Sequence, residues 1–298
     1  MKYQWIQAHR RQWAVERQCQ ALAVSVSGYY GWCQRQTHPT DRAQRQQRLQ
    51  EAIRQYHQAS QRVYGYRRIQ KDIVAAQNPD LPHHPETIRK TMRQMGLRVK
   101  KGRRFVVTTD SKHDCPVAPN VLDRDFSADA PNQKWVTDIT YIPTREGWLY
   151  LAIVLDLFSR RVVGWSMSDR IDTNLVLAAL NMAILNRGPV PNLIHHSDRG
   201  VQYASADYQK RLKDLLIRPS MSRKGNCWDN ACAESFFGSL KNEWTYGKEY
   251  QTREEAKNDI FYYIESFYNR YRRHAYLDGM CPAEFETRYY RLLNRAAV

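Results

Sequence analysis

Several features that would indicate a secreted or membrane-bound protein are missing from this 298-residue chain. No apolar run approaches the roughly 20 residues of a membrane-spanning helix, and the longest lies around WLYLAIVL. We find no signal peptide, no internal repeat of fixed period and no sustained heptad pattern. The six cysteines include no C-x-x-C pair, so we expect reduced thiols in a cytoplasmic protein.

Acidic residues are scarce in the first part of the chain. The formal net charge is +16, from 46 Lys and Arg against 30 Asp and Glu. Residues 1–125 hold 23 basic and 10 acidic side chains, whereas residues 126–298 hold 23 and 20. A basic part joined to a nearly neutral part favours a nucleic-acid-binding module attached to a second domain. A generally basic protein is the alternative.

The pattern of residues 1–40 predicts short helices. Val15, Cys19 and Leu22 fall on one helical face, and Ser27 is a candidate N-cap for a second helix. Two helices with a tight turn between them form either a helix-turn-helix or an ordinary helical hairpin, and this segment does not separate the two.

Residues 41–104 predict a basic, helix-turn-helix-like DNA-binding region that begins with a polar helix near 42–58. Pro85 suits a first helical turn, and Ile88, Met92 and Met95 form an apolar stripe. Basic side chains of this helix lie off the apolar stripe, and further basic residues occur in the preceding helix and just after this one. A solvated basic face is the alternative, but the clustering favours DNA contact. The candidate DNA-binding residues are Arg67, Arg68, Lys71, Arg89, Lys90, Arg93, Lys100, Lys101, Arg103 and Arg104.

Residues 105–130 contain short polar pieces and two prolines, so we expect a linker. Residues 131–290 then predict an α/β domain with a five-stranded mixed sheet flanked by helices. The expected strands are QKWVTDITYIP, GWLYLAIVLDLFS, RRVVGWSMS, PNLIHHSD and IRPSMS. The expected helices are TNLVLAALNMAIL, SADYQKRLKDLL, ACAESFFGSLKNEW and REEAKNDIFYYIESFYNRYRR.

The stretch LIHHSDRGVQY contains two histidines and an aspartate at the end of a strand. Adjacent strand residues point to opposite faces, so His195 and His196 cannot serve one zinc site together. Ser197 lacks the G-x-S-x-G context of a nucleophilic serine. Asp198 remains as the candidate functional group, because polar catalytic groups collect at strand ends in open sheets.

Two further carboxylates are candidate partners of Asp198. Asp138 lies inside the apolar strand WVTDITYI, where a charge is costly unless it binds something, and Glu234 begins the helix ESFFGSLKNEW. Three converging carboxylates suit Mg²⁺ or Mn²⁺. Asp156 is interpreted as a structural residue, and Asp229 as a cap of the following helix. Trp228 and Asn230, on either side of Asp229, are candidate DNA contacts, although Trp228 could equally be a core residue.

Four stretches resemble the catalytic core of the retroviral integrase and transposase superfamily. They are WVTDITYI, LDLFSRRVVGW, HHSDRGVQY and NACAESFFGSLKNEW. Between Asp198 and Glu234 lie 35 residues, a gap that is typical of this superfamily. The whole chain resembles the second-frame protein, OrfB, of insertion-sequence-3 transposases. This wider resemblance includes VYGYRRI, MRQMGL and FYNRYRRHAYLDGMCPAEFE.

The resemblance implies a ribonuclease-H-like fold and a DDE transposase. Asp138, Asp198 and Glu234 would hold two Mg²⁺ or Mn²⁺ ions, and Lys241, seven residues after Glu234, would contact a DNA phosphate. Cleavage would leave a 3′-OH at the element end, which then attacks another phosphodiester. The alternatives are a DNA-binding regulator with a non-catalytic core and a simple metal nuclease.

The resemblance also implies partners. Double-stranded DNA would be bound at the terminal inverted repeats and at the target. The upstream-frame OrfA protein would act beside this chain or fused to it, and pairing two DNA ends requires at least a dimer. We expect a bacterial, nucleoid-associated protein that does not enter a membrane.

Overall fold

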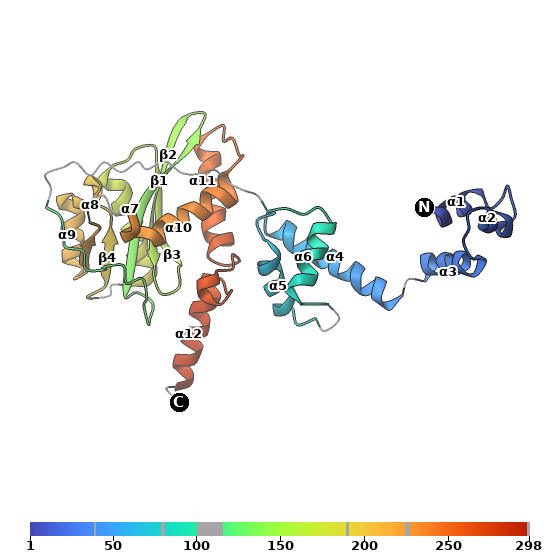
Figure 1. The fold of residues 1–298 in the computed structure, drawn as a ribbon. Helices are drawn as coiled ribbons and strands as arrows, with labels where there is room; N and C mark the ends of the chain where they lie inside the picture. The colour runs from blue at the N-terminus through green and yellow to red at the C-terminus, as the bar shows by residue number, and fades with distance from the viewer. Residues whose placement is uncertain (39, 79–80, 100–115, 189–190, 224–226, 297–298) are drawn as a thin grey trace. The chain divides into compact units, whose positions relative to one another are not determined.

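The computed structural model describes residues 1–38, 40–78, 81–99, 116–188, 191–223 and 227–296. The chain divides into two compact units, Met1–Val99 and Lys100–Val298 (Figure 1). In the described ranges, no helix is both long enough and apolar enough to cross a membrane.

The first unit begins with three short helices, α1 Lys2–His9, α2 Val15–Ala21 and α3 Val26–Thr37. Ile6, Cys19 and Tyr29 form their buried core. The prediction of Ser27 as an N-cap is wrong. Ser25 caps α3 instead, because its backbone is extended and its hydroxyl can accept from the amide of Gly28 at 3.0 Å.

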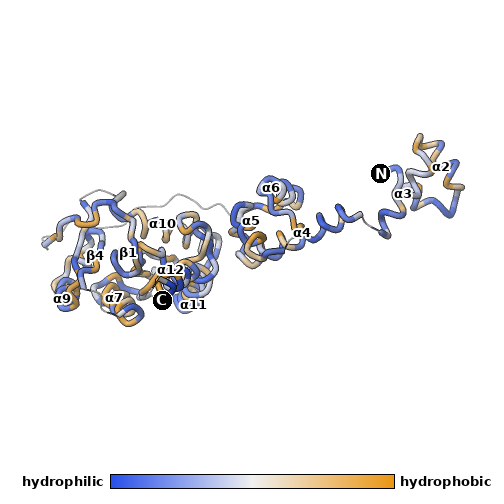
Figure 2. The backbone as a smooth tube through the Cα atoms, turned by 90° about the horizontal axis from the view of Figure 1, so that it is seen from below, coloured by the Kyte–Doolittle hydropathy of each residue, from blue (hydrophilic) through white to orange (hydrophobic). Residues whose placement is uncertain are grey.

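Three further helices follow, α4 Asp41–Ala59, α5 Tyr66–Ala75 and α6 Pro85–Gln94. The predicted polar helix at 42–58 is confirmed as α4, which is largely hydrophilic (Figure 2). Pro85 opens α6 as expected, and Ile88 and Met92 are buried, while Met95 is half-buried. The buried apolar side chains shared by the three helices are Leu49, Ile53, Ile69, Ile73 and Ile88.

The second unit is built on a five-stranded mixed sheet of order β3-β2-β1-β4-β5, as predicted. β1 pairs antiparallel with β2 and parallel with β4. β2 pairs antiparallel with β3, and β4 pairs parallel with β5. The strands are β1 Lys134–Thr144, β2 Gly147–Asp156, β3 Val162–Ser168, β4 Ile194–Ser197 and β5 Arg218–Met221.

Helices flank this sheet (Figure 1). The strands and three helices, α7 Thr173–Arg187, α8 Val201–Ala204 and α9 Ala206–Asp214, share one buried apolar core. α7 can approach β3 closely because Gly164 has no side chain, since a Cβ there would lie 2.2 Å from the carbonyl oxygen of Ala179. α10 Ala231–Ser239 and α11 Arg253–Tyr262 contact β1, and α11 also contacts β2.

Two helices that the sequence predicts as continuous contain π-helical segments. η2 Leu240–Thr245 continues α10, and η3 Tyr263–Tyr268 continues α11. A π turn takes one more residue than an α turn, which rotates the residues after it about the helix axis. The aromatic side chains of the two segments meet: the Trp244 ring lies 5.3 Å from Tyr263 and 5.1 Å from Phe267, between centroids.

The last helix, α12 Pro282–Ala296, is fixed to the sheet by one buried carboxylate. Glu286 is 3% exposed and accepts from Arg187 at 2.5 Å, from Arg161 at 2.8 Å and from the Ser159 hydroxyl at 2.6 Å. Arg187 ends α7, and Ser159 and Arg161 lie between β2 and β3. Glu286 therefore joins α12 to the end of α7 and to the connection between β2 and β3.

The outer edge of the sheet at β3 is covered by side chains from helical segments. The amide of Asn269 accepts from the backbone N–H of Val162 and donates to its carbonyl, both at 3.0 Å. The Asn186 amide donates to the carbonyl of Val163 at 2.9 Å, and the N–H of Trp165 faces the sulfur of Met182 at 3.4 Å. Side chains thus take the positions that a neighbouring strand would occupy.

The segment expected as a linker is described only from residue 116 onward, and this part packs on the sheet. The hydroxyl of Ser220 in β5 accepts from the backbone N–H groups of Val121 and Leu122, at 2.9 and 3.1 Å. Leu122 is 2% exposed. Residues 105–115 lie outside the described residues, and the boundaries 1–40, 41–104, 105–130 and 131–290 stay predictions.

Candidate active site

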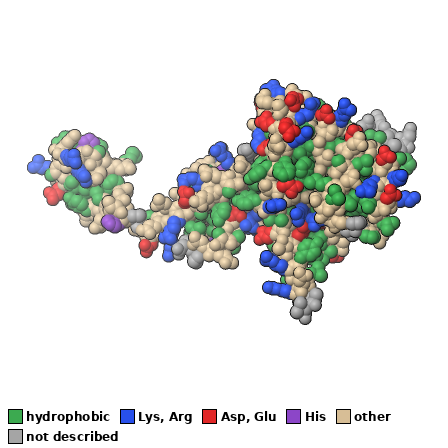
Figure 3. Space-filling view, turned by 180° about the vertical axis from the view of Figure 1, so that it is seen from behind, with side chains coloured by type: hydrophobic (Ala, Val, Ile, Leu, Met, Phe, Trp, Pro, Cys, Tyr) green, Lys and Arg blue, Asp and Glu red, His purple; other side chains and the backbone are tan. Residues whose placement is uncertain are grey.

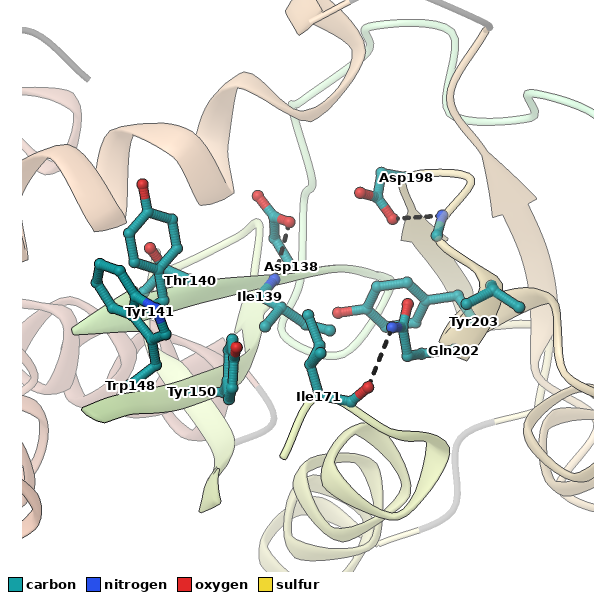
Figure 4. A pocket seen from close by; sticks show the side chains of 12 residues that line it. Asp138, Ile139, Thr140, Tyr141, Trp148, Tyr150, Ile171, Asp198, Gln202 and Tyr203 are labelled. Carbon is teal, nitrogen blue, oxygen red and sulfur yellow. Dashed lines mark hydrogen bonds between the residues drawn. The ribbon is translucent and has the colours of Figure 1, made fainter. Parts of the chain in front are cut away.

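Asp138 and Asp198 are placed side by side by the parallel pairing of β1 with β4. The pairing covers only Lys134 to Val136 of β1, so Asp138 stands just beyond the last paired residue. Asp198 directly follows Ser197, the end of β4. Both side chains line one cavity of about 460 Å³ and point to the same side of it (Figure 4). The structure thus brings together two of the three predicted acids.

Asp198 is oriented by the turn that follows it. Its Oδ1 accepts from the backbone N–H of Gly200 at 2.9 Å, and the hydroxyl of Ser197 donates to its carbonyl at 2.8 Å. A Cβ at position 200 would lie 3.0 Å from Asp198 Oδ1, so glycine gives this carboxylate its room. The side chain is half-buried, with one oxygen held by the protein backbone.

The two histidines beside Asp198 pack inside the domain. His195 Nε2 lies 2.7 Å from the hydroxyl of Tyr208, and the His196 ring nitrogens lie 2.8 and 3.0 Å from the hydroxyls of Ser220 and Ser222. Burial lowers the pKa of His195 to about 3 and that of His196 to about 4, so both rings are neutral near pH 7. They hold β4 against α9 and β5.

Asp138 has an electrostatically unfavourable position. Its Oδ1 accepts a local bond from the N–H of Ile139, at 2.8 Å. Burial raises the pKa of Asp138 well above its ordinary value, and the negative charges of Asp198 and Glu234 raise it further, while Lys241 opposes them. The four predicted groups therefore share one electrostatic neighbourhood.

Glu234 is the fourth residue of α10 and lies outside the lining of the cavity. Its side chain is exposed, although partial desolvation still raises its pKa. Across the described ranges, no group of three His, Cys, Asp or Glu side chains is arranged tightly enough to hold a metal ion. The structure therefore brings Glu234 near Asp138 without closing the three carboxylates around a common point.

The residues nevertheless suit a divalent cation. Asp138 and Asp198 offer carboxylate oxygens, which hard cations prefer, and their mutual repulsion is a cost that a bound cation relieves. Zinc would favour histidine or cysteine ligands, whereas the neighbouring histidines are buried and engaged with hydroxyl groups.

Lys241 stands at the same site. It is the second residue of η2, and its Nζ lies 4.6 Å from the centroid of the Tyr141 ring. Burial lowers the pKa of Lys241, and the charge of Asp138 opposes this shift. The sequence spacing of seven residues from Glu234 thus places the ammonium group near the acids.

Thr137 connects β1 to β2, to α8 and to the residue that precedes α10. Its hydroxyl donates to the carbonyl of Ile153 at 2.6 Å and lies 3.2 Å from the hydroxyl of Tyr203, in α8. Its carbonyl accepts from the side-chain amide of Asn230, which precedes α10, at 3.1 Å. Sequence reasoning missed this residue, because a threonine in a strand carries no signal of its long-range partners.

Two interpretations of the loop before α10 are wrong. Asp229 does not cap that helix. It is fully buried and pairs with the nearby Arg223 and with Arg124, both at 2.9 Å, and folding brings Arg124 to it from 105 positions away. Asn230 is 5% exposed, and its amide nitrogen donates within the domain, so this side chain is not presented to DNA. The interpretation of Asp156 as structural is confirmed, since it is fully buried and accepts from the N–H groups of Asn132 and Phe158.

The described candidate DNA-binding residues lie on α5 and α6. On α6, Arg89 and Lys90 approach Glu86 at 2.7 and 4.0 Å, and Arg93 is exposed. On α5, Arg67 and Lys71 are exposed, and Arg68 lies over the Tyr64 ring. Lys100, Lys101, Arg103 and Arg104 lie outside the described residues. Lys and Arg side chains appear on the described surface of both units (Figure 3).

Comparison with known families gives three matches. An HTH-like domain matches residues 44–105, and two models described as integrase core domain match residues 128–227 and 234–289. Transposase InsF for insertion sequence IS3A of Escherichia coli K12 is 44% identical over 288 residues, which cover 97% of this chain and 99% of that protein. The insertion element IS600 uncharacterized 31 kDa protein of Shigella sonnei is 43% identical, covering 92% and 99%.

Among solved structures, the HTLV-2 integrase catalytic core domain in complex with magnesium is 18% identical. The match covers 54% of this chain and 99% of the integrase chain, with a TM-score of 0.41.

An HTH-like domain followed by an integrase core on a five-stranded mixed sheet defines a DNA-binding transposase, an enzyme of the polynucleotidyl-transferase class. Within that class, the chain belongs to the insertion-sequence-3 family of transposases.

Proposed function

We propose that this transposase cleaves the 3′ end of its insertion element and transfers that strand to another phosphodiester. Asp138, Asp198 and Glu234 hold two Mg²⁺ or Mn²⁺ ions for this reaction. The observation that carries the proposal is the Asp138–Asp198 pair, whose side chains line one cavity and whose charges repel. Such a pair is unfavourable in a folded protein unless a cation joins it.

The protein side chains around this pair position the reacting groups. Two divalent ions in such a site activate the attacking oxygen and stabilise the leaving oxygen of an in-line displacement. Asp138 lies within β1 and Asp198 directly follows the end of β4. Thr137, next to Asp138, accepts from Asn230 at the start of α10. Glu234 has an exposed side chain, so it can turn toward the cavity when substrate binds. Lys241 holds a phosphate oxygen beside the acids.

One set of residues serves both steps, because only the nucleophile changes. Water attacks first and leaves a 3′-OH, and the 3′-OH attacks second. The proposed scheme needs no covalent bond between enzyme and DNA. The described cations of α5 and α6, on the HTH-like region, bind the element ends.

The wider assembly follows from the same chemistry. Two element ends must meet for strand transfer, so at least two copies of the chain act together on DNA. We further propose that the upstream-frame OrfA protein acts with this chain or fused to it, on the nucleoid of a bacterial cell.

Purified protein mixed with labelled element-end DNA tests the proposal. Wild-type protein should yield cleaved and joined products only with Mg²⁺ or Mn²⁺, and Asp198→Asn should abolish both. Asp207→Asn, at an exposed acid on α9, is the matched control and should keep activity. Each assay is run with and without the upstream-frame protein. Binding without cleavage would indicate a DNA-binding regulator, and cleavage without joining would indicate a nuclease.

A further inference from the structure

The cavity that contains Asp138 and Asp198 has a second part without charge. Beside the two carboxylates, its lining includes the side chains of Tyr141, Trp148 and Tyr150, with Ile171 and Val201 (Figure 4). Phosphate groups and metal ions use the acidic part, whereas aromatic and aliphatic walls bind them poorly. The uncharged part therefore suits a flat and largely apolar partner.

Trp148 is the most exposed aromatic wall of this part, with 50% of its surface accessible. Its ring meets the Tyr141 ring edge to face, with centroids 4.7 Å apart and an interplanar angle of 86°. The Nζ of Lys241 lies over the same Tyr141 ring at 4.6 Å. Tyr141 thus stands between a cation suited to phosphate and an exposed indole.

The strand that carries Trp148 is held firmly. The Arg253 guanidinium donates to the carbonyl of Trp148 at 3.1 Å, and the Arg253 N–H donates to Glu146 at 2.8 Å. Within the hairpin, the Thr144 hydroxyl donates to the carbonyl of Gly147 at 2.7 Å. The backbone that carries the indole is therefore held in place before a ligand binds, which lowers the conformational cost of binding.

We propose that Tyr141, Trp148 and Tyr150 form a subsite for one nucleobase that is turned out of the DNA duplex next to the phosphodiester under attack. The inference rests on the proposed function, because it needs DNA at Asp138 and Asp198. The base is the flat and apolar component of a nucleotide, and aromatic side chains stack on any base. A base inside the duplex has both faces covered by its neighbours, so only one turned outward can enter.

The subsite is tested by removing the base and the indole separately and together. Element-end duplexes with a single abasic position, moved one nucleotide at a time past the scissile phosphate, are cleaved by wild-type protein and by Trp148→Ala. One position should lower wild-type cleavage about 5- to 150-fold, the range for one stacked base. Trp148→Ala should lose a similar factor on intact DNA and lose little more on that abasic DNA. Trp148→Phe should recover most of the activity.

Tyr290→Ala is the matched control, because Tyr290 is a 47% exposed aromatic residue on α12. It should leave both intact and abasic cleavage unchanged. The subsite is contradicted if no abasic position matters to the wild type, if Trp148→Ala behaves like Tyr290→Ala, or if the two losses multiply.

A second readout needs binding but no cleavage. 5-Iodouracil placed at each position near the scissile phosphate is irradiated in complex with full-length protein in the presence of a chelator. The crosslink should map to Tyr141, Trp148 or Tyr150 at one position and should disappear from residue 148 in Trp148→Ala. Crosslinks that map elsewhere at every position overturn the subsite even if the DNA is cleaved normally. Loss of metal-dependent cleavage in wild-type protein, by contrast, counts against the proposed function.

Discussion

The side-chain amide of Asn230 donates to the backbone carbonyl of Thr137 across 3.1 Å. Thr137 precedes Asp138 in β1, and Asn230 immediately precedes α10, the helix of Glu234. Two residues that are 93 positions apart in sequence thus set the separation of a strand and a helix that each carry a proposed metal ligand.

Asn230→Ala is expected to lower cleavage more than it lowers the folded fraction. The change removes a buried hydrogen bond and should cost about 1–3 kcal/mol of unfolding free energy. The misplaced helix should lower activity further. Denaturant unfolding and a cleavage assay measure the two effects. Asn269→Ala removes a buried amide-to-carbonyl bond at β3, and it should lose stability without an added loss of activity per folded molecule.

Asp138→Asn is expected to stabilise the protein in the absence of divalent metal. The ionised carboxylate at this position is disfavoured by burial and by the negative charges of Asp198 and Glu234. A cation bound only to the folded state raises its stability, so Mg²⁺ should raise the wild-type Tm and leave the variant almost unchanged. Thermal unfolding in chelator and in Mg²⁺ measures both. An equal Mg²⁺ shift in the two proteins would contradict a metal site at Asp138.

Lys241→Met is expected to weaken binding of element-end DNA and to lower the salt slope of log K by about 1, as for a lost phosphate contact. The exposed Lys213 on α9 provides the control Lys213→Met. Lys241→Arg should keep most of the salt slope, since the positive charge remains. Binding titrations from 50 to 200 mM salt give the slopes, and equal slopes for Lys241→Met and wild type would remove this lysine from the DNA contact.

Glu86→Gln is expected to strengthen DNA binding several-fold. Glu86 holds the guanidinium of Arg89 by two hydrogen bonds, at 2.8 and 2.7 Å, so the carboxylate competes with a DNA phosphate for this cation. Neutralising the glutamate also removes a charge that repels DNA. Glu51→Gln releases Arg54 on α4 in the same way and serves as the control. A stronger effect from Glu51→Gln would place the DNA on α4.

Glu286→Ala is expected to cost about 3–5 kcal/mol, since it leaves Arg187 buried without its carboxylate. Burial raises the pKa of Glu286, but the bonds and charge of Arg187, with Ser159 and Arg161, lower it overall below 4.5. Its contribution to stability is therefore present above pH 4.5 and is lost as the pH falls through the lowered pKa. Unfolding of wild type and variant between pH 7 and pH 3 should show the difference shrinking in acid.

The sheet and two acids could be predicted from sequence because they depend on local patterns. Asp138 interrupts an apolar, β-branched strand, and Asp198 ends another, and both signals lie within a few residues. The role of Asp229 could not be predicted in this way. Its partner Arg124 is 105 positions away, and only the folded chain brings the two together. A side chain that accepts from a distant residue has the same local sequence as one that caps a helix.

The π-helical segments and Thr137 were missed for a related reason. η2 and η3 have helix-forming sequences, and the contact between Trp244 of η2 and Tyr263 of η3 joins two segments that are separate in sequence. The aromatic lining of the cavity was also missed, because Tyr141 and Trp148 belong to an ordinary hairpin pattern. Features that depend on contact between two segments far apart in sequence become visible only in the folded structure.

The amide of Asn269, which bonds to the backbone of Val162, also bears on how this protein could associate with further copies of itself. Exposed strand edges invite fibre growth by addition of strands from other molecules. At β3 the groups that would recruit such a strand, on Val162, Val163 and Trp165, already face Asn269, Asn186 and Met182. A second copy could extend the sheet through these residues only by displacing those side chains, so a contact between copies on this side would use helices and loops.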